Sequence, residues 1–206
     1  MNRTHFTFTG AAVASLIALA GCAGNSGSDS MPGMDHGSSG TSASPSANSS
    51  DAGHNAADTM FARMMIPHHA QAVEMSDAML AKADIPTAVM DLAVKIKEAQ
   101  APEIEKMTAW LKTWNEDATM PADGHDAHGM DGMLSDADLQ KLKDAQGVEA
   151  AKLFLTQMIA HHEGAVSMAK TETSQGKNPE AVQLGKDIIA AQEAEIREMR
   201  GLLAGL

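Results

Sequence analysis

A motif that occurs twice constrains the fold of this 206-residue chain more than any other feature. The first copy starts at Phe61 and reads Phe-x3-Met-Ile-x-His-His-x2-Ala-Val-x-Met, and the second starts 93 residues later at Phe154. The segment from Ile96 to Met107 also recurs, from Ile188 to Met199, as Ile-x3-Gln-x2-Glu-Ile-x2-Met. Each half therefore predicts a helical hairpin. A hairpin cannot bury its apolar face alone, so the two together predict a four-helix bundle.

The periodicity predicts long helices at about 58–83, 86–115, 135–174 and 179–203, with a break at Gly147 in the third. Pro86 and Pro179 suit the first turn of a helix, and Ser135 and Asn178 suit N-cap positions. Aromatic residues make up only 3% of the chain, which disfavours an all-β sandwich or barrel. We expect an all-α domain at 55–206, with repeats at 56–116 and 135–206 and a Met/His-rich linker at 117–134.

The N-terminus has the pattern of an export signal. Arg3 precedes the apolar run 11–20, which is too short to span a bilayer. The run ends in Leu-Ala-Gly-Cys, which resembles a bacterial lipobox, and Cys22 is the only cysteine of the chain. We expect residues 1–21 to be removed and Cys22 to be acylated, which would anchor the protein by lipid to the outer face of the membrane. The alternative is an ordinary signal peptide. Residues 22–54 are predicted to form a flexible Ser/Gly-rich tether.

Charge and cysteine content limit the partners of the chain. The formal net charge of −12 disfavours nucleic acids and anionic lipid headgroups, and it suits cations. Contact with the membrane is expected through the N-terminal lipid alone. If Cys22 is acylated, no free thiol remains, so any soft metal ligand must come from methionine or histidine. The chain contains 16 methionines, some of which we expect to be core packing.

One helical face carries histidine and methionine where leucine would be ordinary. In each repeat a Phe, Met, His, Ala and Met follow one another at intervals of four and three, which places them on one stripe. A buried imidazole must be hydrogen-bonded or ligated, and imidazole with thioether suits Cu(I) and Ag(I), while imidazole also suits Cu(II) and Zn(II). The candidate metal ligands are Met65, His68, His69, Met75, Met158, His161, His162 and Met168.

Within this set His68 and His161 lie on the stripe, while His69 and His162 lie on its flank as ligands or as hydrogen-bonding neighbours of the ligands. The pairs Gln100/Glu103 and Gln192/Glu195 could bond these histidines, supply oxygen ligands or be ordinary helix surface. Weaker candidates occur in the tether and the linker: Met31, Met34, His36, His125, His128, Met130 and Met133.

The segments 61–69 and 154–165, with the second helices that follow them, resemble the duplicated signature of the family named domain of unknown function 305 (DUF305). That family includes CopM-like copper-binding proteins of the bacterial envelope. The resemblance implies a ferritin-like four-helix fold, copper or silver binding, and a ligand role for the eight candidates above. The family often has Asp three residues before the Phe. Asp58 fits this pattern, whereas the second copy has Ala151.

These observations predict an extracytoplasmic protein that binds copper, with silver or zinc as other ions, for metal tolerance or homeostasis. A homo-oligomer or a copper-exchange partner is compatible with this prediction. A helical lipoprotein without metal, with a structural or partner-binding role, is the main alternative. A ferritin-like oxidoreductase is disfavoured because it needs Glu-x-x-His motifs, and Glu163 follows His162 in the wrong order.

Overall fold

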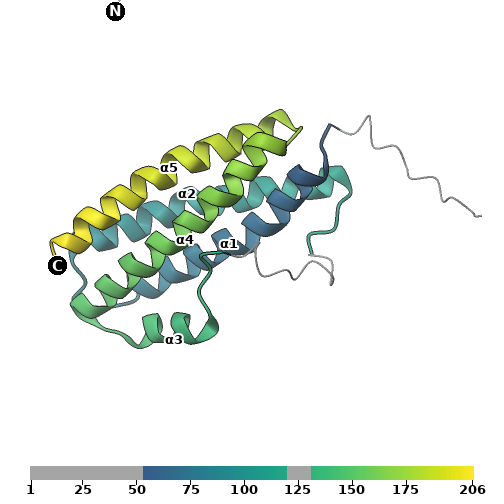
Figure 1. Cartoon of the computed structure of the whole chain (residues 1–206). Coiled ribbons are helices and arrows are strands. Elements are labelled where there is room, and N and C mark those ends of the chain that lie inside the picture. The colour runs from purple at the N-terminus through teal and green to yellow at the C-terminus, as the bar shows by residue number, and fades with distance from the viewer. Residues whose placement is uncertain (1–52, 120–130) are drawn as a thin grey trace, which may run out of the picture. The chain divides into compact units, whose positions relative to one another are not determined.

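The computed structural model describes residues 53–119 and 131–206, all of which fall in one unit of the chain. These residues form helices and no strand, so the all-α prediction is confirmed. Figure 1 shows the helices, which are α1 (Ala56–Leu80), α2 (Thr87–Trp114), α3 (Asp136–Asp144), α4 (Gly147–Gln175) and α5 (Pro179–Ala204). None of them is long and apolar enough to cross a membrane.

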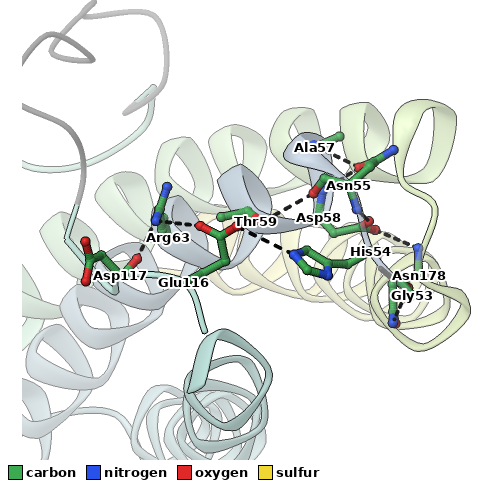
Figure 2. Close-up of polar contacts among 10 residues, drawn as sticks. All are labelled: Gly53, His54, Asn55, Ala57, Asp58, Thr59, Arg63, Glu116, Asp117 and Asn178. Carbon is green, nitrogen blue, oxygen red and sulfur yellow. Dashed lines mark hydrogen bonds and ion pairs between the residues drawn. The ribbon is translucent and has the colours of Figure 1, made fainter. Parts of the chain in front are cut away.

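Side-chain caps fix where several helices begin. Asn55 accepts hydrogen bonds from the N–H groups of Ala57 and Asp58, and the Asp58 carboxylate accepts from the Asn55 N–H, which completes a capping box (Figure 2). Ser135 and Asn178 cap α3 and α5 as predicted. Asp58 also accepts the backbone N–H groups of Lys177 and Asn178, so the start of α1 is joined to the turn between α4 and α5.

The region predicted as one helix over 135–174 is two helices. The short α3 ends at Asp144, and α4 starts at Gly147, whose φ of +55° a residue with a side chain would rarely adopt. The predicted break is therefore confirmed, but the residues before it form a separate helix that contacts α1 and α4. Helices α1 and α2 continue through Pro67 and Pro102.

The four long helices pack as two hairpins joined face to face. Helix α1 packs against α2, α4 packs against α5, and α1 packs against α4 (Figure 1). Side chains also connect α2 with α5, because Lys95 pairs with Glu198 and the Trp110 indole N–H donates to Glu180. Each long helix therefore has two long neighbours, and the four surround a common interior.

Two apolar clusters fill this interior. Residues at corresponding positions of the two repeats lie in different clusters. The first cluster contains Phe61, Met65, Met107, Ala165 and Ile188, and their counterparts in the second cluster are Phe154, Met158, Met199, Ala72 and Ile96. Along α1, Met65 belongs to the first cluster and Ala72 to the second, with His68 between them. A layer of histidine therefore separates the two halves of the core.

Candidate metal centre

His68 of α1 and His161 of α4 meet at the centre of the molecule. Their ring centroids are 3.7 Å apart with the planes tilted by 39°, and the residues are only 0% and 1% exposed. Among the described residues, no group lies in good hydrogen-bonding geometry with a nitrogen of either ring. Buried polar atoms are almost always bonded because losing water without a replacement costs free energy. Packing alone therefore does not explain why histidine occupies these two positions.

His69 and His162 lie beside this pair, and each is held by a glutamate from the second helix of its own hairpin. His69 Nε2 lies 2.7 Å from Glu103 Oε2, and His162 Nε2 lies 2.8 Å from Glu195 Oε2. Because a carboxylate accepts, each Nε2 donates its proton and the lone pair is left on Nδ1. Both Nδ1 atoms are buried, and neither has a hydrogen-bond partner in the described part of the chain. Metal-binding histidines commonly have this arrangement, in which a carboxylate fixes the tautomer.

The sequence predicted that His69 and His162 lie on the flank of the stripe. It left open the roles of the pairs Gln100/Glu103 and Gln192/Glu195. In the structure both histidines are fully buried, and the glutamates are the residues that bond them. Gln100 is buried, and neither of its amide atoms is bonded to a described residue, so it does not hold any of these four histidines.

Burial sets the charge state of the histidines. It lowers the pKa of His68 to about 3, and a charge on His69 would lower it further, while the Asp131 backbone acts in the opposite direction. Burial also lowers the pKa of His161 and, despite the neighbouring Glu195, that of His162. These three rings are therefore neutral near pH 7, which is the form that binds a metal ion.

The end of the linker covers the histidine layer. A Cβ atom on Gly164 would lie 1.8 Å from the Asp131 carbonyl oxygen, and one on Gly132 would lie 2.5 Å from the carbonyl oxygen of Ala160. Gln71 holds the segment by exchanging two hydrogen bonds with the Leu134 backbone, at 2.7 and 3.0 Å. The sequence reasoning missed this contact. The signal that could have predicted it was Gly164, a glycine inside a long helix. Glycine lowers helix stability at such a position, and it is expected there when another segment must approach closely.

The predicted methionines fall into three environments. Met65 and Met158 are fully buried one turn before His68 and His161, in the first and second clusters. Met75 lies deep in the second cluster, about 10 Å along α1 from His68. Met168 is partly exposed at a cavity between α1 and α4.

Cys22 and most of the weaker candidates lie outside the described residues: Met31, Met34, His36, His125, His128 and Met130. Met133 is described and is half-buried at the covering segment.

The donor atoms suit a soft metal ion, but the two facing rings lie too close together for both to bind one ion. Two imidazoles that share one ion, each binding it at about 2 Å, need ring centroids roughly 5 Å or more apart. At 3.7 Å the His68 and His161 rings would have to separate to do so. Among the residues that the structure describes, no three His, Cys, Asp or Glu side chains are placed to hold one ion together. Any ion held by these four histidines would therefore need few ligands, thioether ligands or a rearrangement of the rings.

These features match a known family. Residues 58–203 match the model of the family described as Domain of unknown function (DUF305). The chain belongs to this family. Its fold is similar to a DUF305 protein of Streptomyces coelicolor described as secreted, with 36% identity and a TM-score of 0.68, covering 72% of this chain and 91% of that one. A DUF305 fragment from Deinococcus radiodurans is 32% identical with a TM-score of 0.66, covering 74% and 98%.

The protein CopM is a further structural relative within DUF305-like folds. Its Cu(I)-bound form is 34% identical to this chain with a TM-score of 0.59, covering 72% of this chain and 96% of CopM. The structures of CopM bound to Cu(II) and to Ag are similar to this chain to nearly the same degree. An uncharacterised protein of Acanthamoeba polyphaga mimivirus is 42% identical over 52 residues, which is 25% of this chain and 34% of that protein.

Proposed function

We propose that this protein binds Cu(I), and also Ag(I), at the central histidine layer, and that it serves metal tolerance or homeostasis outside the cytoplasm. One observation carries the proposal: four buried histidines from both halves of the chain present ring nitrogens that have no hydrogen-bond partner among the described residues. A bound ion would remove the cost of burying these atoms. We propose Met65 and Met158, one turn away on the same helices, as the thioether ligands nearest to this layer.

The donor set favours a soft monovalent ion over zinc. Structural zinc sites use four ligands in tetrahedral geometry, whereas the described residues offer no group of three His, Cys, Asp or Glu for one ion. Thioether and imidazole together suit Cu(I). The Cu(I), Cu(II) and Ag forms of CopM support the same class of ion. Nothing in this donor set calls for a reaction, so we propose binding without enzymatic activity.

We propose that the chain is exported and anchored by lipid at Cys22, which rests on the lipobox-like sequence and on a relative described as secreted. Fatty-acid labelling of the protein in bacterial cells, compared with Cys22→Ala, tests the anchor. Equal labelling of the two chains would contradict it.

A double replacement of the facing histidines tests the metal site. In His68→Leu/His161→Leu the affinity for Cu(I), measured by competition with a chelator, should fall by about 100-fold or more. The free energy of unfolding should rise by about 1–3 kcal/mol, because unbonded polar groups are replaced by apolar ones of similar size. His54→Leu is the control, since His54 stacks on Trp114 away from this layer. A folded double variant with unchanged Cu(I) affinity would refute the proposal.

A further inference from the structure

A cavity of about 360 Å³ lies between the first turns of α1 and the last turns of α4, and three methionines line it. Met60 and Met64 are one helical turn apart on α1, and Met168 comes from α4. Met60 is 39% exposed, and the other two are partly exposed, so solvent reaches the thioethers. The central histidine layer, in contrast, is closed to solvent.

The three methionines do not follow from the repeat. In the other half of the chain, Leu153 and Gln157 stand at the positions that correspond to Met60 and Met64. Met75 corresponds to Met168, but it is fully buried in the second apolar cluster. Methionine in a core needs no further explanation, because it fills irregular gaps. Met168 packs against the first apolar cluster, whereas Met60 is exposed at the cavity, so core packing does not account for the whole group.

A buried acid lies at the same cavity. Glu172 lines the cavity wall and is only 1% exposed, yet neither carboxylate oxygen accepts a hydrogen bond from a donor among the described residues. Its polar neighbour is Asp58, which is another acceptor and is already engaged by backbone N–H groups. A positive ion in the cavity would stabilise the ionised form of this acid, which burial and Asp58 otherwise disfavour.

We propose that this cavity is a second site for a soft monovalent ion, Cu(I) or Ag(I), held by the thioethers of Met60, Met64 and Met168. This site rests on the proposed function for the class of metal. It extends metal binding to residues outside the histidine layer. Thioether sulfur selects Cu(I) over harder ions. Met60, Met64 and His68 follow one another at intervals of four on α1, so Met64 is one helical turn from the histidine layer.

Methyl NMR of the full chain, labelled with ¹³C in its methionine methyl groups, tests this site with silver nitrate. The ε-methyl signals of Met60, Met64 and Met168 should shift together at one common Ag(I) concentration. The variant Met60→Leu/Met64→Leu/Met168→Leu keeps side-chain volume and should bind one Ag(I) fewer, whereas Met90→Leu on α2 should not. Three unmoved signals, or an unchanged Ag(I) count in the folded triple variant, would overturn the proposal.

The histidine variant separates this site from the central one. In His68→Leu/His161→Leu the three methyl signals should still shift with Ag(I), at a concentration within threefold of that for the unmodified chain. That result supports the cavity site even if the histidine layer proves to bind no metal. A loss of the three shifts in this variant would mean that they report the central layer, and it would refute a separate site.

Discussion

At the scale of single residues, the glutamates of the second helices decide what the second histidine of each motif can do. Glu195 accepts a hydrogen bond from the Nε2–H of His162, so the free lone pair of this ring lies on Nδ1. The His69–Glu103 contact repeats this arrangement in the other hairpin, although the Glu103 side chain is more exposed, at 24% against 7% for Glu195. The better shielded His162 pair should contribute more to binding.

Glu195→Gln should weaken Cu(I) binding by about 10- to 100-fold, because the neutral amide orients His162 less strongly and lowers the basicity of Nδ1. The variant should stay folded, since glutamine has nearly the same shape. Glu193→Gln is the matched control, because Glu193 is two residues away and pairs with Lys170 on the surface. Chelator competition measures both variants. An equal affinity in the two would show that the carboxylate does not act on a ligand.

At the scale of elements, a close contact between the linker and α4 closes the histidine layer. The contact depends on Gly164, since the Asp131 carbonyl occupies the space that a side chain would need. The segment is further held by Gln71 of α1, so it touches both helices that carry the facing histidines. The part of the linker outside the described residues includes His125, His128 and Met130.

Gly164→Ala should lift the segment 131–134 from α4 and lower the free energy of unfolding by about 1–3 kcal/mol. Gly201→Ala on α5 is the matched control, because nothing lies within 4 Å of its added Cβ. That change should raise stability by up to about 1 kcal/mol through helix propensity alone. Urea unfolding gives both values, and hydrogen exchange at Asp131–Leu134 should increase only in Gly164→Ala. The same sign of change for both alanines would contradict the contact.

At the scale of the whole molecule, a pair of buried acids links stability to pH. Burial and the adjacent Asp58 carboxylate raise the pKa of Glu172 to about 8. The protonated acid is therefore favoured in the folded chain, and its ordinary pKa of about 4.3 applies when the chain unfolds. This contribution to stability is fully present below pH 4 and is lost as the pH rises through 8.

Glu172→Gln should remove this dependence, because glutamine resembles the protonated acid and cannot ionise. The pKa shift sets an upper limit of about 5 kcal/mol, and relaxation around the ionised group reduces the expected loss between pH 5 and pH 9 to about 2 kcal/mol. Urea unfolding at the two pH values measures it in both chains. Glu163→Gln on the exposed face of α4 is the control. An equal pH dependence in Glu172→Gln and the unmodified chain would contradict the assignment.

The sequence alone could predict a helical domain and the inward position of His68 and His161, because both depend on spacing within one helix. The short α3 was not separated from α4, since nine helical residues carry too little periodicity to stand apart. The full burial of His69 and His162 was also missed. Spacing places them beside the stripe, and only the approach of α2 and α5 covers them.

The sequence by itself determined the two hairpins, the absence of thiol ligands from the described domain and the pairing of histidine with methionine on one face. The tertiary structure decided which residues meet. It set the two facing rings 3.7 Å apart, gave each flanking histidine its glutamate, laid Asp131 over Gly164, and gathered Met60, Met64 and Met168 at one cavity. The physical reason is that helical periodicity fixes the direction of a side chain, whereas contacts between helices depend on how they pack against one another.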